Sequence, residues 1–252
     1  MNMHAVRKSE GKACAPKSSS NIITRIEFPY TNPEIKLKID RVIDSLKTKQ
    51  VAEIRLPAAV ALLQKIGTTA KILQAKRQLP EVVMTKLIKS FETARLTAQY
   101  IGNACYGLKG LDGCHKTTKR LVGVLAQKIE ASDAVLSAQA IGNACYGLHG
   151  LEGRDPSTKQ LVNVLSEKIK SSSSVLEAQH IGNACYGLHG LEGSDPTTKQ
   201  LVSVLAQKIE ASHVVLNAQE IGNACYGLHG LEGSDLSTKQ LVSVLAGKIE
   251  AS

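Results

Sequence analysis

Three Cys–His pairs, each four residues apart, could perform covalent chemistry in this chain: Cys145 and His149, Cys185 and His189, Cys225 and His229. Side chains four residues apart are neighbours on a helix, and an imidazole beside a thiol can produce a nucleophilic thiolate. The first copy of the pattern carries Cys105 and Lys109 instead. An active site is not ordinarily repeated in tandem, and both His and Lys stabilise the C-terminus of a helix. The pairs therefore favour a structural role.

The cysteines are spaced for burial rather than for binding a metal. Four of them stand at a constant step of 40 residues, at Cys105, Cys145, Cys185 and Cys225. Metal ligands must converge to within about 2–2.3 Å of one ion, whereas neighbouring helices in a stack lie about 8–10 Å apart. We expect a buried row of cysteines, no metal and no cofactor, with Cys14 and Cys114 as the alternative sites of redox chemistry. The phosphate-loop, zinc-protease and nucleophile-elbow motifs are absent from the sequence, which therefore predicts a non-enzymatic protein.

The cysteines recur because the chain is a tandem repeat. The string IGNACYGL begins at four positions 40 residues apart, Ile101, Ile141, Ile181 and Ile221. In the second unit, apolar residues at helical spacing predict a first helix over about 135–148, closed by a left-handed turn at Gly150. Asp155 and Pro156 then predict the N-cap and the first residue of a second helix. A single hairpin cannot bury its apolar side, but stacked hairpins bury it jointly.

The sequence therefore predicts an all-α fold, a right-handed α-solenoid of tandem helix–turn–helix repeats with an N-terminal helical cap. We expect residues 1–20 to be a disordered basic leader, residues 21–92 to be a helical region with a degenerate repeat, and residues 93–252 to be four 40-residue repeats. In the region before the repeats, helices are expected over about 32–49, 57–77 and 80–91.

The degenerate copy is indicated by Gln64 to Gly67, which keep the Gln-x-Ile-Gly spacing of the repeat, and by Leu87 to Phe91 in the place of residues 125–129. Small residues recur on the first helix of each unit, at Gly142, Ala144 and Gly147 in the second. Because a glycine inside a helix costs about 1 kcal/mol, these positions indicate close packing between the first helices of adjacent units.

In its period, its two-helix plan and the placement of its turn residues, the repeat over residues 93–252 resembles the helical-hairpin solenoids. This class includes the HEAT, armadillo and octotricopeptide types. The chain departs from the Pro-Pro-Pro-Glu-Trp signature of the octotricopeptide type, since it contains no Trp. The resemblance implies binding of proteins or RNA, an implication that comes from the fold alone.

One candidate binding feature is an asparagine that recurs away from the apolar side of the first helix, at Asn103, Asn143, Asn183 and Asn223. A row of amides on the exposed face of a solenoid could hydrogen-bond the main chain of an extended partner. The alternative is that each asparagine bonds a neighbouring helix or turn and holds the stack together. Both interpretations stay open at the level of the sequence.

A second candidate is a pair of positions that vary between otherwise nearly identical units. One position reads Tyr100, Ala140, His180 and Glu220, and the other reads Thr97, Ser137, Glu177 and Asn217. The two lie three residues apart and are therefore neighbours on the helix surface. We expect an exposed strip that is adapted unit by unit to a partner, with neutral drift as the alternative.

Charge separates the two classes of partner. All of the net charge of +9 lies in residues 1–92, and residues 93–252 are balanced. Phosphate binding needs cations along its track, whereas the variable strip offers Glu177 and Glu220 and neither Lys nor Arg. We therefore expect a non-enzymatic scaffold that binds a protein or peptide. The alternative is an RNA-binding repeat protein that uses the basic leader together with the strip.

Location and assembly can be predicted more coarsely. The chain has no apolar run of about 18–20 residues and no secretory signal peptide, so we expect no membrane span. Cysteines in such a chain favour an intracellular, cytoplasmic protein, with a secreted effector as the alternative. The last repeat lacks a following neighbour, and its uncovered leucines, Leu228, Leu241 and Leu245, are expected to form a homodimer about a two-fold axis.

Overall fold

The computed structural model describes residues 22–23, 32–48, 53–73 and 76–250, and the expectation for residues 1–20 lies outside them. The fold is all-α apart from two short parallel strands, β1 (Ile22–Ile23) and β2 (Glu53–Ile54). The helices are α1 (Asn32–Lys47), α2 (Leu56–Leu73), α3 (Glu81–Glu92), α4 (Ala98–Leu108), α5 (Lys116–Glu130), α6 (Ala138–Tyr146), α7 (Pro156–Ser171), α8 (Ala178–Tyr186), α9 (Pro196–Glu210), α10 (Ala218–Leu228) and α11 (Leu236–Glu250). Across the described residues, every helix is too short or too polar to cross a membrane.

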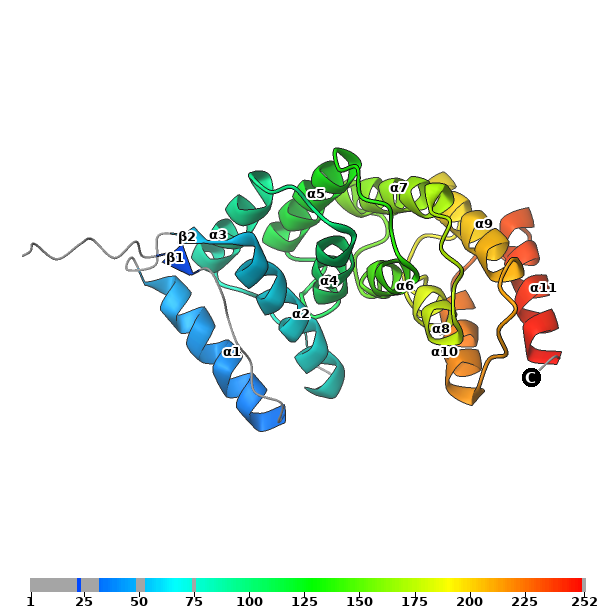
Figure 1. Ribbon diagram of the computed structural model, residues 1–252, viewed down its shortest axis with the longest axis horizontal. Helices are drawn as coiled ribbons and strands as arrows, with labels where there is room; N and C mark the ends of the chain where they lie inside the picture. Colours follow the sequence, from blue (N-terminus) through cyan, green and yellow to red (C-terminus); the bar gives the residue numbers. More distant parts are fainter. Residues whose placement is uncertain (1–21, 24–31, 49–52, 74–75, 251–252) are drawn as a thin grey trace, which may run out of the picture.

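The helices form two parallel rows in which each helix packs against the second one along the chain. One row consists of α2, α4, α6, α8 and α10, here called the A helices, and the other of α3, α5, α7, α9 and α11, the B helices. Figure 1 shows the two rows as layers of one arc, with the A helices on its inner side and the B helices on its outer side. Helix α1 packs against α2 and α3 at the N-terminal end. The stacked hairpins are those of a helical-repeat protein.

The local start and stop signals of the sequence are largely confirmed. Asp155 caps α7 by accepting a hydrogen bond from the main-chain N–H of Ser157 at 2.9 Å, and Pro156 is the first helical residue. Gly150 has the expected positive φ, +83°. The predicted start of the A helix at residue 135 is wrong, because α6 begins at Ala138 after a cap at Ser137.

Adjacent A helices touch main chain to main chain at one glycine in each unit. A Cβ atom added to Gly147 would lie 1.9 Å from the carbonyl oxygen of Cys105, and one added to Gly187 would lie 1.8 Å from that of Cys145. Gly107 meets the carbonyl of Leu63 in the same way, at 2.5 Å. The expected close packing at these glycines is thus confirmed. It also places Leu63 of α2 where the repeats have cysteine, which differs from the alignment on Gln64 to Gly67.

The B helices are tied together at their N-termini by ion pairs that cross from one repeat to the next. Lys159 lies 2.6 Å from Asp195 and 3.5 Å from Glu192, while Lys119 and Lys199 meet the corresponding acids of the following repeats. Burial alone would raise the pKa of Asp195, but hydrogen bonds from Lys159 and Thr197 outweigh it and lower the pKa to about 2. Each N-cap acid therefore stabilises its own helix and the junction with the previous repeat.

A second lysine joins the other ends of the B helices. Lys128 donates to the carbonyl of Glu92 at 3.2 Å, at the C-terminus of the preceding B helix. Lys168, Lys208 and Lys248 donate in the same way to the carbonyls of Ser132, Ser172 and Ser212. A cation at a helix C-terminus is favourable because it meets the negative end of the helix dipole. The three junctions between α5, α7, α9 and α11 are therefore held at both ends, and the junction between α3 and α5 carries the lysine contact at the C-terminal end.

The last repeat buries two of the leucines that were expected to be uncovered. Leu241 and Leu245 are buried in α11, which packs against α9, and Leu228 is half-buried. The large exposed apolar side chains of this repeat are instead Val215, Tyr226, Leu236, Val242 and Ile249. The expectation that Leu241 and Leu245 form the contact surface is wrong, because these side chains face the third repeat.

The glycine contacts can be tested by adding a single methyl group. Gly187→Ala forces the Cβ against the carbonyl of Cys145, so we expect a loss of about 1–3 kcal/mol in the free energy of unfolding. Gly222→Ala is the matched control in α10, because nothing lies within 4 Å of that position. There the better helix propensity of Ala should add up to about 1 kcal/mol. Denaturant unfolding followed by circular dichroism measures both, and equal effects would contradict the packing.

Candidate functional site: the exposed side of the A helices

Three residue types recur along one face of the A helices, from exposed to buried. In the second repeat they are Gln139, Asn143 and Tyr146, whose spacing of four and then three residues places them on one face of α6. Because the A helices stack side by side, each type forms a row across the repeats. The glutamine row consists of Gln99, Gln139, Gln179 and Gln219, all exposed, and the asparagine row of Asn103, Asn143, Asn183 and Asn223, all half-buried.

The tyrosines form a continuous stack along the array. The ring centroids of successive members are 5.5 Å apart for Tyr106 and Tyr146, and 4.9 Å apart for each of the two later steps to Tyr186 and Tyr226. A second stack runs beside it, with 5.5 Å between His149 and His189 and between His189 and His229. Offset-stacked rings at these separations attract one another.

The two stacks interlock between repeats. The ring of His149 lies 4.6 Å from that of Tyr186, and the ring of His189 lies 4.3 Å from that of Tyr226. Lys109 occupies the histidine position of the first repeat, and its Nζ lies 3.9 Å from the centroid of the Tyr146 ring. A cation at this distance from an aromatic face is attracted by the negative face of the ring. The stack therefore begins with a lysine side chain and continues with rings.

Burial disfavours the charged forms of His149 and Tyr146 in this stack. Desolvation is the main reason that the pKa of His149 falls to about 4, and the nearby His189 and Lys109 lower it further. Burial also raises the pKa of Tyr146, and the neighbouring tyrosines add to the effect. At neutral pH the His149 imidazole is therefore neutral and the Tyr146 hydroxyl is protonated, which allows close ring contacts without repulsion.

One asparagine contributes to the packing between helices. The Oδ1 atom of Asn103 accepts a hydrogen bond from Nε2 of Gln64 in α2, at 3.4 Å. This is the stack-holding role that the sequence left open beside binding. The four asparagines are half-buried, so part of each side chain reaches solvent.

The two variable positions are the N-cap and the third residue of each A helix. Thr97 and Ser137 accept hydrogen bonds from the main-chain N–H of the residues three positions on, Tyr100 and Ala140. In the later repeats the pairs form reciprocal capping boxes, Glu177 with His180 and Asn217 with Glu220. The two positions vary together because each pair is one capping unit.

The variable strip was expected to be exposed, and this is wrong at two of the four residues that stand third in an A helix. Ala140 is 3% exposed and Glu220 is 8% exposed, because each packs on a glycine of the preceding A helix, Gly102 or Gly182. Tyr100 and His180 are half-buried, while the four N-cap residues are exposed. The glutamine and asparagine rows, together called the amide rows, are the same in every repeat and are exposed or half-buried. They form the constant accessible surface of the A helices.

The cysteine row is buried in three repeats and open in the fourth. Cys105, Cys145 and Cys185 are fully buried, whereas Cys225 and Cys114 are exposed. Burial raises the pKa of Cys105 and of Cys185 to about 12, so these thiols stay protonated at neutral pH. A protonated thiol is a poor nucleophile. The geometry therefore favours the structural role of the Cys–His pairs in these repeats.

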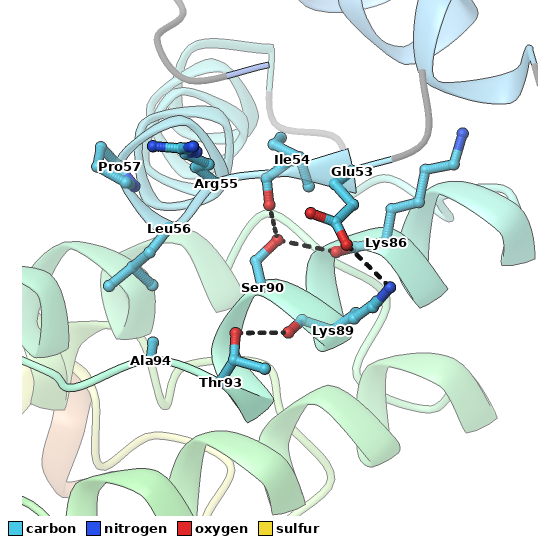
Figure 2. A pocket seen from close by; sticks show the side chains of 10 residues that line it. All are labelled: Glu53, Ile54, Arg55, Leu56, Pro57, Lys86, Lys89, Ser90, Thr93 and Ala94. Carbon is cyan, nitrogen blue, oxygen red and sulfur yellow. Dashed lines mark hydrogen bonds and ion pairs between the residues drawn. The ribbon is translucent and has the colours of Figure 1, made fainter. Parts of the chain in front are cut away.

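A separate hollow of about 420 Å³ lies between β2 and α3 near the N-terminal end. Figure 2 shows Ser90 at its centre, with its hydroxyl oxygen within hydrogen-bonding distance of the carbonyl of Ile54 and, at 2.9 Å, of that of Lys86. Lys89 pairs with Glu53 across its mouth at 3.1 Å. These polar groups hold β2 against α3. Among the described residues, no group of three or more His, Cys, Asp or Glu is arranged to hold a metal ion.

The tyrosine row was missed by reasoning from the sequence, although Tyr recurs in every copy of IGNACYGL with His or Lys three residues later. That shared spacing was the available signal. Comparison of the chain with protein-family models, with curated proteins and with solved structures finds no match. The class of the protein therefore rests on the stacked hairpins, and its function must be argued from the repeated surface.

The burial of the thiols predicts their reactivity. Cys105, Cys145 and Cys185 should react with a bulky maleimide more than about 100-fold more slowly than Cys225, because access to them requires local unfolding. In denaturant all four should react at similar rates. Site-resolved mass spectrometry measures the rates, and fast native labelling of Cys145 would show that the helix packing is wrong.

Acid should destabilise the protein through His149. Its pKa is 6.5 in the free side chain and about 4 in the folded protein, so the folded state binds fewer protons between these values. The stability is therefore complete above about pH 6.5 and falls as the pH drops towards 4. The Tm measured from pH 7.5 to 4.5 should fall, and less steeply in His149→Gln. His213→Gln, in an exposed loop, is the control, and the same slope in all three proteins would contradict the prediction.

Proposed function

We propose that this protein is a non-enzymatic binding scaffold that presents the exposed side of its A helices to a protein or peptide in an extended conformation. The observation that carries the proposal is the fourfold recurrence of an exposed Gln and a half-buried Asn on the inner layer of the arc. The amino acids that repeat there are the ones that both donate and accept hydrogen bonds.

The main chain of an extended peptide carries the hydrogen-bonding groups that the glutamine and asparagine rows can bind. It presents main-chain N–H and C=O groups on the same side every two residues, a step of about 6.6–6.8 Å. The glycine contacts bring corresponding side chains of adjacent repeats close, as the 4.9–5.5 Å steps of the tyrosine stack indicate. An extended partner that crosses the stacked A helices can therefore contact the amides of several repeats, and the partly exposed tyrosine rings offer an apolar edge for its side chains.

The charges support a protein partner over RNA. The amide and tyrosine rows are uncharged, and Lys109 at the head of the histidine row is buried against rings. Several cations of the N-terminal region are engaged within the chain, since Arg77 pairs with Asp40 at 2.5 Å and Lys47 with Asp44 at 2.8 Å. RNA binding needs a track of available cations, so it stands as the second candidate.

Three further expectations belong to this proposal. Helices α1–α3 act as a cap on the N-terminal end of the array, as their packing against α4 and α5 supports. The superhelix is right-handed. The protein works in the reducing cytoplasm, which its free cysteines support. Self-association through the fourth repeat also stays a prediction.

The proposal predicts that the amides matter for binding and little for stability. Replacing Gln139, Asn143, Gln179 and Asn183 together with Ala should weaken the partner at least about tenfold, because each lost hydrogen bond costs about 0.5–1.5 kcal/mol. The free energy of unfolding should change by less than about 0.5 kcal/mol per site. Partners are captured from native lysate with and without nuclease, identified by mass spectrometry and titrated against both proteins.

The matched control is Gln127→Ala with Gln207→Ala, which removes two exposed amides from the B helices α5 and α9. It should leave capture unchanged. Capture that disappears after nuclease treatment would favour RNA as the partner. A large drop in Tm of the fourfold variant would show that the amides hold the stack, and unchanged affinity would overturn the proposed surface.

A further inference from the structure

The turn between each A helix and its B helix, here called the A–B link, is built alike in successive repeats. The link covers residues 147–155 in the second repeat and 187–195 in the third. Gly150 and Gly190 have positive φ angles, +83° and +90°. The next residue, Leu151 or Leu191, donates its main-chain N–H to the carbonyl three residues earlier, at 3.0 or 3.1 Å. The carbonyl groups of the two glycines are therefore equivalent.

A lysine from outside the repeats lies on the link of the second repeat. The Nζ atom of Lys76 donates to the carbonyl of Gly150 at 2.7 Å. The contact depends on the glycine, because a Cβ atom added there would lie 2.0 Å from Nζ and 2.7 Å from Cε of the lysine. This link therefore holds an ammonium group on its carbonyl and the end of a carbon chain over its glycine.

The corresponding place in the third repeat is open. Among the residues that the structure describes, nothing lies within 4 Å of a Cβ atom added to Gly190. The place is nevertheless inside the array, since the links on both sides touch the link of the third repeat. A Cβ atom added to Gly153 would lie 2.6 Å from the carbonyl oxygen of Gly190, and one added to Gly193 would lie 2.8 Å from that of Gly230.

The chain carries an acid where a lysine for the third repeat would have to stand. Arg77 pairs with the link of the first repeat as Gly113 pairs with that of the second, so Lys76 and Asp112 occupy equivalent positions. The Oδ1 atom of Asp112 accepts a hydrogen bond from the main-chain N–H of Cys114 at 3.1 Å. An ionised carboxylate has no proton to donate to a carbonyl group. A donor for the link of the third repeat must therefore come from another source.

The surroundings of the open place favour a positive charge. A hollow of about 560 Å³ runs along the links of the second to fourth repeats and includes Gly190 and the buried Leu191. Its charged side chains are Glu152, Glu192, Glu232 and Arg154. The ion pairs that these groups form along the junctions join six carboxylates with four cations. The surplus of carboxylates attracts a cation and repels an anion.

We propose that the A–B link of the third repeat binds a primary ammonium group from outside the chain, carried on a flexible carbon chain as in a lysine side chain. The ammonium group donates to the carbonyl of Gly190 as Lys76 donates to that of Gly150. The carbon chain passes over the glycine and contacts Leu191, and the surplus carboxylates balance the charge. The site contains none of the amide rows and is additional to the proposed scaffold surface.

The test follows the ¹⁵N–¹H spectrum of the full chain during titration with the blocked peptide acetyl-Gly-Lys-Gly-amide and, separately, with butylamine. We expect saturable shifts of the Gly190 and Leu191 amides, with a dissociation constant of order millimolar for one charge-assisted hydrogen bond. The amide of Gly150 should stay unchanged, because Lys76 already occupies that link. Equal responses to both probes would assign the site to the amine alone, and a larger response to the peptide to a lysine in a polypeptide.

Two further probes act as controls for charge. The same peptide with Nε-acetyl-lysine is neutral and inorganic phosphate is an anion, so neither should shift Gly190. A shift with phosphate, an equal shift with the acetylated peptide, or no shift with either amine would overturn the proposal.

Removing the internal lysine tests the equivalence of the links. In Lys76→Ala the amide of Gly150 should begin to respond to the lysine peptide, while the Tm stays unchanged because Lys76 is exposed. Lys116→Ala is the matched control, since it removes another exposed lysine at the start of α5. Gly150 should remain unresponsive there. A Gly150 that also stays unresponsive in Lys76→Ala would overturn the proposal.

Filling the site from within gives an independent test. Asn tolerates a positive φ better than other side chains, so Gly190→Asn places an amide over the link with little backbone strain. The response at Leu191 should weaken at least about tenfold. Unchanged binding would contradict the site, and the Lys76→Ala test does not depend on this variant. The fourfold variant of the amide rows should keep the ammonium response, so failure of either proposal leaves the other standing.

Discussion

The structure depends on the contact between a glycine of one A helix and a cysteine carbonyl of the A helix before it. At Gly147, Gly187 and Gly227 there is no room for a Cβ atom, because the carbonyl oxygen lies 1.8–1.9 Å from where it would be. The main chains therefore meet without a side chain between them. The contact recurs at a step of 40 residues, so residue types that recur on the open side of the A helices form rows across the repeats.

That constraint determines which residue types can recur. An amide side chain can lie beside the same amide of the next repeat because it both donates and accepts hydrogen bonds. An aromatic ring can lie beside the same ring of the next repeat because the two rings stack. A row of lysines or glutamates at 5 Å spacing would repel itself. Charges occur instead where two different positions meet across a junction, as Lys159 meets Asp195. The outer layer thus holds the ion pairs, while the open side of the inner layer carries amides and rings.

Features that follow local rules could be predicted from the sequence, and features created by the stacking could not. Asp155, Pro156 and Gly150 act within a few residues of themselves, so their roles follow from residue type. The start of the A helix was placed too early because Ala134, which packs against the core from the loop, falls on the apolar side of the helical pattern and extends it beyond the true cap at Ser137. The apolar pattern of the sequence indicates which residues are buried, and in the loop before Ser137 residues are buried without being helical.

The candidate site shows the same division. The variable pair was expected to be an exposed strip because its role as a cap cannot be recognised until the helix start is known. Once Ser137 is the N-cap, the partner position at Ala140 turns towards Gly102 of the previous helix. The tyrosine row lies beside the apolar stripe and has no helical period of its own. Its stacking exists only when neighbouring units approach as closely as the glycines allow.

The equivalence of the junctions has a consequence for how such a protein can change in evolution. Gly227 meets Cys185 as Gly187 meets Cys145, so the loss or duplication of a whole unit among the last three keeps this glycine–carbonyl contact at every junction. The first unit is not interchangeable, because Asp112 donates its main-chain N–H to the carbonyl of Arg77 at 3.0 Å, outside the repeats. Copy number can therefore vary without any new interface, and the length of partner that the array spans would vary in proportion.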